Sequence, residues 1–320
     1  MPKITVLNHE IIKELLPLDK TLELVEAAFT EFYQQKSQLY PAVRELVPNH
    51  HGIFGIKSSY LLEDQCIGLK AGGFWSKNTE RHKMNHQSTM VLFDAETGEP
   101  ICLLDANYVT IMRTAAAGAI AAKYLARKES EVVSVIGSGT QAKAQVEGLL
   151  HLFPIKEVVV YSRTVESANH FVRQLLEKGV AARFTHSPEE AVRTADIVIT
   201  TTPSFSPVVQ TSWIKAGTHI SAVGSDTIGK RELMIDKPVD KVVCDYWEQC
   251  SIMGELQYGF PRHELYAEIG QITSGDKVGR QQANETTLFD TTGLSIQDLK
   301  TAFHVYKQAK KNGIGQTIML

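Results

Sequence analysis

A run of six residues, Gly137-Ser138-Gly139-Thr140-Gln141-Ala142, carries the clearest chemical signal in the sequence. It directly follows the apolar stretch 132–136 and opens a segment with helical periodicity, the setting in which a GxGxxG/A pattern indicates a dinucleotide site. Gly137 permits a tight turn, Gly139 lets the backbone approach a pyrophosphate, and Ala142 lets helix and strand pack closely. The first helical N–H groups favour an anion. We therefore predict that a dinucleotide phosphate binds at Gly137, Ser138, Gly139, Thr140 and Gln141.

The residues that end the next predicted strand bear on the choice of nicotinamide dinucleotide. An Asp or Glu at that position binds the adenine ribose 2′-hydroxyl of NAD, whereas this chain has Ser162-Arg163-Thr164 and no acid. Two hydroxyls and a guanidinium suit a 2′-phosphate, because Arg pairs with phosphate oxygens through two parallel hydrogen bonds. The sequence therefore favours NADP(H) as cofactor, with NAD(H) as the alternative.

Strand-like and helical segments alternate around the glycine loop. Strands are predicted at 131–136, 157–161, 182–184, 196–201, 218–223 and 241–244, and helices at 109–126, 140–152 and 165–177. A further helix is predicted from Ser187, which with Glu190 has the spacing of a capping box. Near-continuous apolar strands that alternate with helices predict a parallel sheet covered on both faces. We therefore expect an α/β protein in which residues 113–294 form a Rossmann domain, a doubly wound parallel sheet.

The N-terminal part has a different organisation. A helix is predicted at 19–34 with Asp19 as its N-cap, followed by strand-like segments at 52–60, 66–71, 89–94 and 100–105. Strands without intervening helices predict a largely antiparallel sheet. The segment 295–311 has the pattern of an amphipathic helix, which we expect to pack back on this part. Residues 1–112 with 295–320 are therefore predicted to form an α+β domain for substrate binding and dimerisation.

Composition argues against several other classes of protein. The chain of 320 residues is 43% hydrophobic and 22% charged with a formal net charge of −3 and no basic cluster, so we expect no nucleic-acid or membrane partner. No apolar stretch is long enough to span a bilayer and the N-terminus lacks a signal peptide's apolar core, which predicts a cytoplasmic protein. The four cysteines lack metal-site spacing, so we expect reduced thiols and no metal.

Short motifs along nearly the whole chain resemble the ornithine cyclodeaminase/mu-crystallin family. Beside the glycine loop they are Gly68-Leu-Lys70, 85–89, Leu92-Phe-Asp94, Arg113-Thr-Ala-Ala116, Val223-Gly-Ser-Asp226, Glu232-Leu233 and Phe289-Asp-Thr-Thr-Gly293. The resemblance implies a Rossmann domain, a dimerising domain built from both termini, and hence a homodimer. Its members include ornithine cyclodeaminases, alanine dehydrogenases, cyclic-imine reductases and a thyroid-hormone-binding crystallin.

The resemblance assigns Arg44, Lys70 and Arg113 to the substrate. Arg offers a planar clamp for the carboxylate of an amino or imino acid, and Lys70 in an apolar strand is expected to have a lowered pKa and to exchange a proton with the substrate nitrogen. The resemblance also implies that Asp226 is an acid/base group and that Thr292 contacts the substrate. Its implied cofactor contacts are Asn85, His86, Arg113, Thr114, Thr201, Thr202, Val223, Gly224, Lys230 and Thr291.

One departure from the family concerns ornithine. Ornithine cyclodeaminases hold the distal ammonium of the substrate with a glutamate between their equivalents of Arg44 and Lys70, whereas this chain has Gly55 at about that register and Lys57 nearby. A distal amine would meet a like charge at Lys57. Lys57, with Lys77 or His82, could instead accept a second substrate carboxylate.

These observations favour an NAD(P)H-dependent reductase that converts an α-imino acid to an amino acid, or its reverse, an amino-acid dehydrogenase. The substrate would be a cyclic imine such as pyrroline-2-carboxylate, or the imine of a 2-oxo acid such as iminopyruvate or iminosuccinate. One alternative is an ornithine cyclodeaminase-type lyase that releases ammonia and keeps NAD bound. The other is a non-catalytic, crystallin-like protein that binds NADPH.

Overall fold

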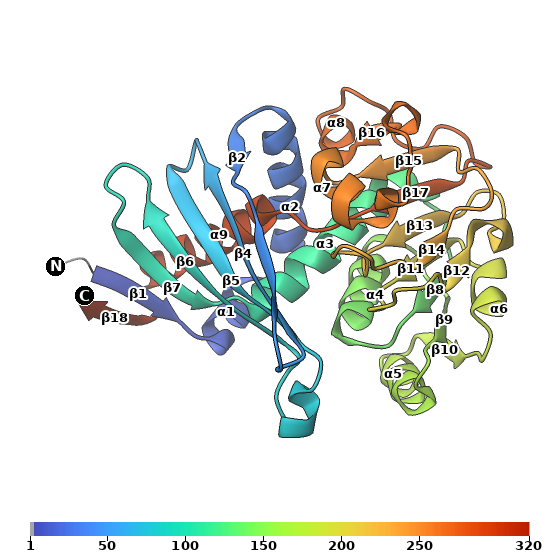
Figure 1. Cartoon of the computed structure of the whole chain (residues 1–320), viewed down its shortest axis with the longest axis horizontal. Helices are drawn as coiled ribbons and strands as arrows, with labels where there is room; N and C mark the ends of the chain where they lie inside the picture. Colours follow the sequence, from blue (N-terminus) through green and yellow to red (C-terminus); the bar gives the residue numbers. More distant parts are fainter. Residues whose placement is uncertain (1–2, 320) are drawn as a thin grey trace. The chain divides into compact units, whose positions relative to one another are not determined.

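The structure, a computed structural model, describes residues 3–319 and divides into two compact units (Figure 1). The first unit is made from the two ends of the chain, up to Arg113 and from Leu294 onward, and the second is Thr114–Gly293. Each unit has hydrophobic core clusters of its own. Arg113 and Leu294, which the sequence placed with the Rossmann segment, belong to the first unit.

The first unit contains a sheet with the strand order β18-β1-β7-β6-β5-β4-β2 and with β3 paired to β4. All these pairs are antiparallel except β1 with β7, which confirms the largely antiparallel sheet. Its strands are β1 (Lys3–Leu7), β2 (Ser37–Leu39), β3 (Val43–Val47), β4 (Gly52–Leu61), β5 (Cys66–Trp75), β6 (His86–Asp94), β7 (Pro100–Asp105) and β18 (Gln316–Met319). Its helices are α1 (His9–Leu15), α2 (Leu18–Tyr33), the 3₁₀ turn η1 (Asn78–Arg81), the start of α3 (Asn107–Leu125) and α9 (Ser295–Asn312).

The two faces of this sheet are buried to different extents. Burial alternates along β5, where Gly68 and Lys70 are buried and Ile67 and Leu69 are half-buried, as expected for a strand with one face in a core. The helix α9 packs on the buried face, where Leu299, Ala302 and Val305 join a core with Met90 and Leu92. The prediction that the C-terminal helix packs on the N-terminal part of the chain is confirmed.

Two predicted helix caps differ from the structure. The helix α2 begins at Leu18 after Pro17, so Asp19 is not the N-cap but lies in the first turn, where a negative charge still favours the helix dipole. At α6, Ser187 accepts a hydrogen bond from the Glu190 N–H. The Glu190 side chain does not complete a capping box, because it binds Thr185 and Arg183 instead.

The second unit is a doubly wound parallel sheet with the strand order β10-β9-β8-β11-β13-β17-β15-β16, which confirms the predicted fold class. Its strands are β8 (Val132–Ile136), β9 (Glu157–Tyr161), β10 (Ala181–Phe184), β11 (Ile197–Thr200), β13 (His219–Ala222), β15 (Lys241–Cys244), β16 (Ala267–Glu268) and β17 (Thr287–Asp290), beside the small pair β12 (Val209–Gln210) and β14 (Leu233–Met234). Its helices are the rest of α3, α4 (Thr140–Leu152), α5 (Val165–Glu177), α6 (Pro188–Arg193), α7 (Trp247–Met253) and α8 (Ile269–Thr273), with 3₁₀ turns η2 (Thr211–Trp213), η3 (Glu255–Gln257) and η4 (Arg262–Glu264).

The order of the strands in the second unit locates a ligand site. The chain runs outward from β8 through β9 to β10, then returns to the other side of β8 as β11. Ligands of such sheets bind at this switch point, at the carboxyl ends of the strands. Within residues 3–319, no helix is long and apolar enough to cross a membrane and no group of His, Cys, Asp or Glu side chains is arranged to hold a metal ion.

Candidate functional site

Three cationic side chains of the first unit lie on one face of its sheet, the face on which α9 packs. Lys57 on β4 is paired directly with Lys70 on β5, and Arg44 on β3 is paired with Gly55 on β4. Because residues two apart on a strand share a face, Arg44, Lys57 and Lys70 all lie on the same face. Lys70 is only 9% exposed, although its neighbours on the strand are apolar.

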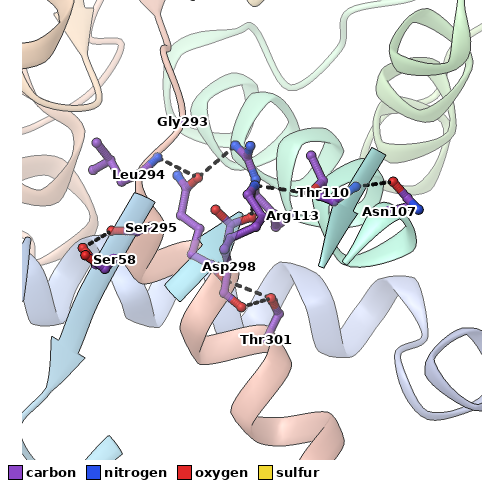
Figure 2. Close-up of polar contacts among 12 residues, drawn as sticks. Ser58, Asn107, Thr110, Arg113, Gly293, Leu294, Ser295, Asp298 and Thr301 are labelled. Carbon is purple, nitrogen blue, oxygen red and sulfur yellow. Dashed lines mark hydrogen bonds and ion pairs between the residues drawn. The ribbon is translucent and has the colours of Figure 1, made fainter. Parts of the chain in front are cut away.

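Lys70 and Arg113 converge on a carboxylate that the sequence did not reveal. Figure 2 shows two of these residues, Arg113 and Asp298, close together. Asp298 on α9 is fully buried, and its Oδ1 accepts hydrogen bonds from Lys70 Nζ at 2.8 Å and from Arg113 Nε at 3.0 Å. Lys70 Nζ also donates to Thr110 Oγ1 at 3.1 Å. Three segments far apart in sequence therefore build one buried cluster from β5, α3 and α9.

Gln297, the neighbour of Asp298, adds a second contact to Arg113. Its Oε1 accepts from Arg113 Nη1 at 3.3 Å and from the Leu294 N–H at 3.3 Å (Figure 2). Gln297 is fully buried, and its Nε2 has no hydrogen-bond partner among the described residues. A buried amide without a partner is costly, so this nitrogen is a candidate donor to a ligand or an ordered water.

The cluster has perturbed protonation equilibria. Burial lowers the pKa of Lys70 to about 7, with Arg113 and Lys57 acting in the same direction and Asp298 opposing them. Burial would by itself raise the pKa of Asp298, but Arg113 and Lys70 together hold it below its usual value. The predicted lowering of the Lys70 pKa is therefore confirmed. A lysine that titrates near neutral pH can both donate and accept a proton.

His86 and Asn85 belong to the first unit and not to the unit with the glycine loop. His86 begins β6, and burial followed by the charge of Lys70 lowers the pKa of its imidazole to about 4. The imidazole is therefore neutral at physiological pH. Asn85 accepts a hydrogen bond from the Thr79 N–H through its side chain, at 3.2 Å, which connects it to the turn η1. The structure thus places His86 in the electrostatic environment of Lys70.

In the second unit, the glycine loop lies between β8 and α4 as predicted. Gly137 has φ +123°, and a Cβ there would lie 2.5 Å from Thr201 Oγ1, so a glycine is required. Gly139 is the N-cap of α4, and apart from its own backbone and its two chain neighbours no heavy atom lies within 4 Å of the place that its Cβ would occupy. Ala142 is fully buried against the sheet. The residues present therefore fit a pyrophosphate: the open space at Gly139 lies before the free N–H groups of Thr140 and Gln141.

The second strand end lies beside this loop. Ser138 Oγ donates to Ser162 Oγ at 3.0 Å, and Arg163 and Thr164 that follow are exposed. At the neighbouring strand ends, the buried Glu232 accepts hydrogen bonds from Thr200 Oγ1 and the Gly224 N–H, both at 2.8 Å, and from the Thr202 N–H. Glu232 therefore ties the ends of β11 and β13 together and holds Thr202 and Gly224 in place.

Asp226 and Lys230 form an ion pair in the loop after β13. Lys230 Nζ lies 2.6 Å from Asp226 Oδ1 and also donates to the Gly224 carbonyl at 3.3 Å. Val223, before this loop, is buried, as is Thr114, whose carbonyl accepts from Gln145 Nε2 at 2.7 Å. Asp226 thus lies at a carboxyl end of the sheet with a cation beside it.

Asp245 holds the loop that contains Thr291 and Thr292. This buried carboxylate, which follows β15, accepts from Thr291 Oγ1 at 2.8 Å, from the Thr292 N–H at 2.9 Å and from the Gly293 N–H at 2.7 Å. Asp245, Gln297 and Asp298 were not predicted from the sequence as site residues. Each contacts a predicted site residue more than forty positions away, so no local pattern could have identified it.

Comparisons with known proteins find relatives along nearly the whole chain. The model of the ornithine cyclodeaminase/mu-crystallin family matches residues 3–313. The chain is 36% identical to an alanine dehydrogenase of Archaeoglobus fulgidus, over 98% of this chain and 97% of that protein. It is 33% identical to an iminosuccinate reductase of Paracoccus denitrificans, over 98% and 99% of the two chains.

Solved structures show the same fold. An archaeal alanine dehydrogenase dimer with bound NAD has a TM-score of 0.94 at 36% identity, with both chains fully covered. The Δ1-pyrroline-2-carboxylate reductase of Thermococcus litoralis, in complex with NADH and L-proline, has a TM-score of 0.93 at 30% identity, over 98% of this chain and all of that one.

Proposed function

Since the chain belongs to the ornithine cyclodeaminase/mu-crystallin family, we propose that it reduces an α-imino acid to the corresponding amino acid with a nicotinamide dinucleotide as hydride donor. The observation that carries this proposal is the buried cluster in which Lys70, with a pKa of about 7, and Arg113 share Asp298. Arg113 and Arg44 bind the substrate carboxylate, as guanidinium groups are suited to do. The glycine loop would hold the dinucleotide, which when bound would supply the hydride for C2 of the substrate.

Lys70 provides the proton that the reaction consumes. In its charged form it donates a proton to the imine nitrogen as C2 is reduced, and in its neutral form it accepts one from the amine in the reverse direction. A pKa near 7 places both forms within reach at neutral pH. Asp226, paired with Lys230, is the second acid/base candidate and Thr292 a further substrate contact.

The charges on the sheet face argue against an ornithine cyclodeaminase. Gly55 lies opposite Arg44, and Lys57 lies opposite Lys70, so the distal ammonium of ornithine would approach cations. The same row of cations suits a substrate with a second carboxylate, such as iminosuccinate. The intact set of Arg44, Lys70, Arg113 and Asp226 also favours catalysis over a crystallin-like binding protein.

A matrix of two cofactors against several imines tests the proposed function. NADPH and NADH would each be combined with pyrroline-2-carboxylate, with pyruvate and ammonia, with pyruvate and methylamine, and with oxaloacetate and ammonia. We expect oxidation of the cofactor in at least one combination, and the substrate that gives the highest kcat/KM identifies the imine. If all combinations were silent while ornithine released ammonia, the reductase proposal would be wrong.

We also propose that NADPH is the preferred cofactor. The strand end 162–164 has no acid for a ribose 2′-hydroxyl, and it presents the exposed Arg163 beside Ser162. Ser162→Asp is expected to shift the ratio of kcat/KM values by about tenfold towards NADH, because a carboxylate repels a 2′-phosphate and accepts from a 2′-hydroxyl. Steady-state kinetics with both cofactors measures the shift. An unchanged ratio would mean that this strand end does not contact the ribose.

We infer that the chain forms a homodimer through the outward face of the first unit's sheet. Apolar side chains alternate onto that face and are only half-buried there: Ile67, Leu69, Val91, Phe93 and Leu103. An apolar face of this kind indicates a contact with another chain. The mass in solution, compared with a chain mass of 35.5 kDa, tests this inference.

A further inference from the structure

Asp298 has a contact pattern that a purely structural carboxylate would not need. One oxygen, Oδ1, accepts hydrogen bonds from both Lys70 Nζ and Arg113 Nε. The other, Oδ2, is buried and has no hydrogen-bond partner among the described residues. Buried ion pairs contribute little net stability, because desolvation of the charges offsets their attraction. Asp298 thus uses its hydrogen bonds to hold two candidate site residues, Lys70 and Arg113. A contribution to the stability of the fold does not explain this arrangement.

We propose that Asp298 is the positioning residue of the reaction: it holds Lys70 and Arg113 side by side against their mutual repulsion, so that the ammonium faces the substrate nitrogen and the guanidinium faces the substrate carboxylate. This role rests on the proposed function. Gln297 assists by fixing Arg113 Nη1. Because α9 supplies both contacts, the C-terminal helix is part of the site.

The charges around Lys70 show why such a residue is needed. Lys57 on β4, His86 on β6 and Arg113 on α3 interact electrostatically with Lys70, and none of these three side chains is acidic. Asp298 on α9 is the acidic side chain that acts on Lys70. Burial, Arg113 and Lys57 lower the pKa of Lys70 to about 7, and Asp298 opposes them. Without Asp298 the pKa of Lys70 would fall further, and the lysine would be neutral at the pH at which it must donate a proton.

Asp298→Asn tests the proposal, since it removes the charge and keeps the shape. Reduction requires charged Lys70, so kcat/KM should fall as the pH rises through the Lys70 pKa, and this limb should move to lower pH in the variant. At pH 8 we expect kcat/KM for imine reduction to fall at least about tenfold. Dinucleotide affinity should change much less than kcat/KM, because the glycine loop belongs to the other unit and the Asp298 carboxylate contacts Arg113 alone among the predicted cofactor contacts.

A second readout follows Lys70 without turnover. Trace acylation of the folded protein with acetic anhydride, followed by mass spectrometry, reports the neutral fraction of the Lys70 amine at each pH. Its midpoint should lie at lower pH in Asp298→Asn than in the unmodified chain. If no imine is reduced by the unmodified chain, the proposed function fails, but this measurement still decides the role of Asp298.

Asp64 provides a matched control. The Asp64 carboxylate forms ion pairs with two lysines of α9, Lys300 at 3.0 Å and Lys307 at 3.1 Å. Asp64→Asn therefore also removes a carboxylate that contacts two cations, but it does not touch the contacts of Lys70. Neither the pH limb nor the Lys70 labelling profile should move. If Asp298→Asn does not fold, Asp298→Glu keeps the charge and should retain the pH limb with a lower kcat/KM. Unshifted profiles in Asp298→Asn, or a shifted limb in Asp298→Glu, would overturn the proposal.

Discussion

The Lys70→Met variant is expected to lose at least about a hundredfold in kcat for imine reduction, because general acid catalysis by a positioned side chain contributes about 10²–10⁴-fold. Methionine fills a similar volume but carries no proton. The dinucleotide affinity should be unchanged, since the glycine loop lies in the other unit. Steady-state kinetics and titration of NADPH fluorescence measure the two quantities separately.

A control must separate the lost proton donor from the lost ion pair. Lys300→Met removes another ion-paired lysine of the first unit, one that contacts Glu31 at 2.8 Å and Asp64 at 3.0 Å. Its unfolding temperature should fall, but kcat should not. A Lys70→Met enzyme with kcat within tenfold of the unmodified chain would show that the proton comes from another group, of which Asp226 is the first candidate.

The regular elements of the second unit could be predicted because each of them is a local pattern. The helices at 140–152 and 165–177 and the strand at 157–161 have the predicted bounds, since apolar periodicity and turn residues lie within a few positions of each other. The strand β17 was not predicted. It lies between β13 and β15 although it comes after both in the chain, and its place in the sheet depends on partners that are more than forty positions away.

The candidate site was predictable only in part, for the same reason. Lys70 stood out because a charged side chain in an apolar strand is unusual. Its partner Asp298 is 228 positions away in a predicted amphipathic helix, where an acidic residue is ordinarily on the solvent side. The polarity pattern of α9 could not show that one acid faces inward. The inward position of Asp298 depends on two long-range features. One is the register of β4 with β5, which brings Lys57 opposite Lys70, and the other is the packing of α9 on these two strands.

The glycine loop leads to the second large effect. In Gly139→Ala, we expect dinucleotide affinity to fall on the order of a hundredfold, which corresponds to about 2.8 kcal/mol. The backbone there has φ −80° and ψ −172°, which any residue adopts, and apart from residue 139 itself and its two chain neighbours no heavy atom lies within 4 Å of the new methyl group. The methyl group would instead occupy space that the pyrophosphate needs. Stability should change by about 1 kcal/mol or less, as for other changes at an N-cap.

Gly137→Ala should behave differently, although it lies only two residues away. Its φ of +123° disfavours any side chain, and its Cβ would come within 2.5 Å of Thr201 Oγ1, so this variant should be destabilised before any ligand is added. Thermal unfolding without ligand and calorimetric titration with NADPH and NADH distinguish the two cases. If Gly139→Ala bound both dinucleotides as tightly as the unmodified chain, no pyrophosphate would pass over the start of α4. The hydride donor in the proposed reaction would then have no binding site in this loop.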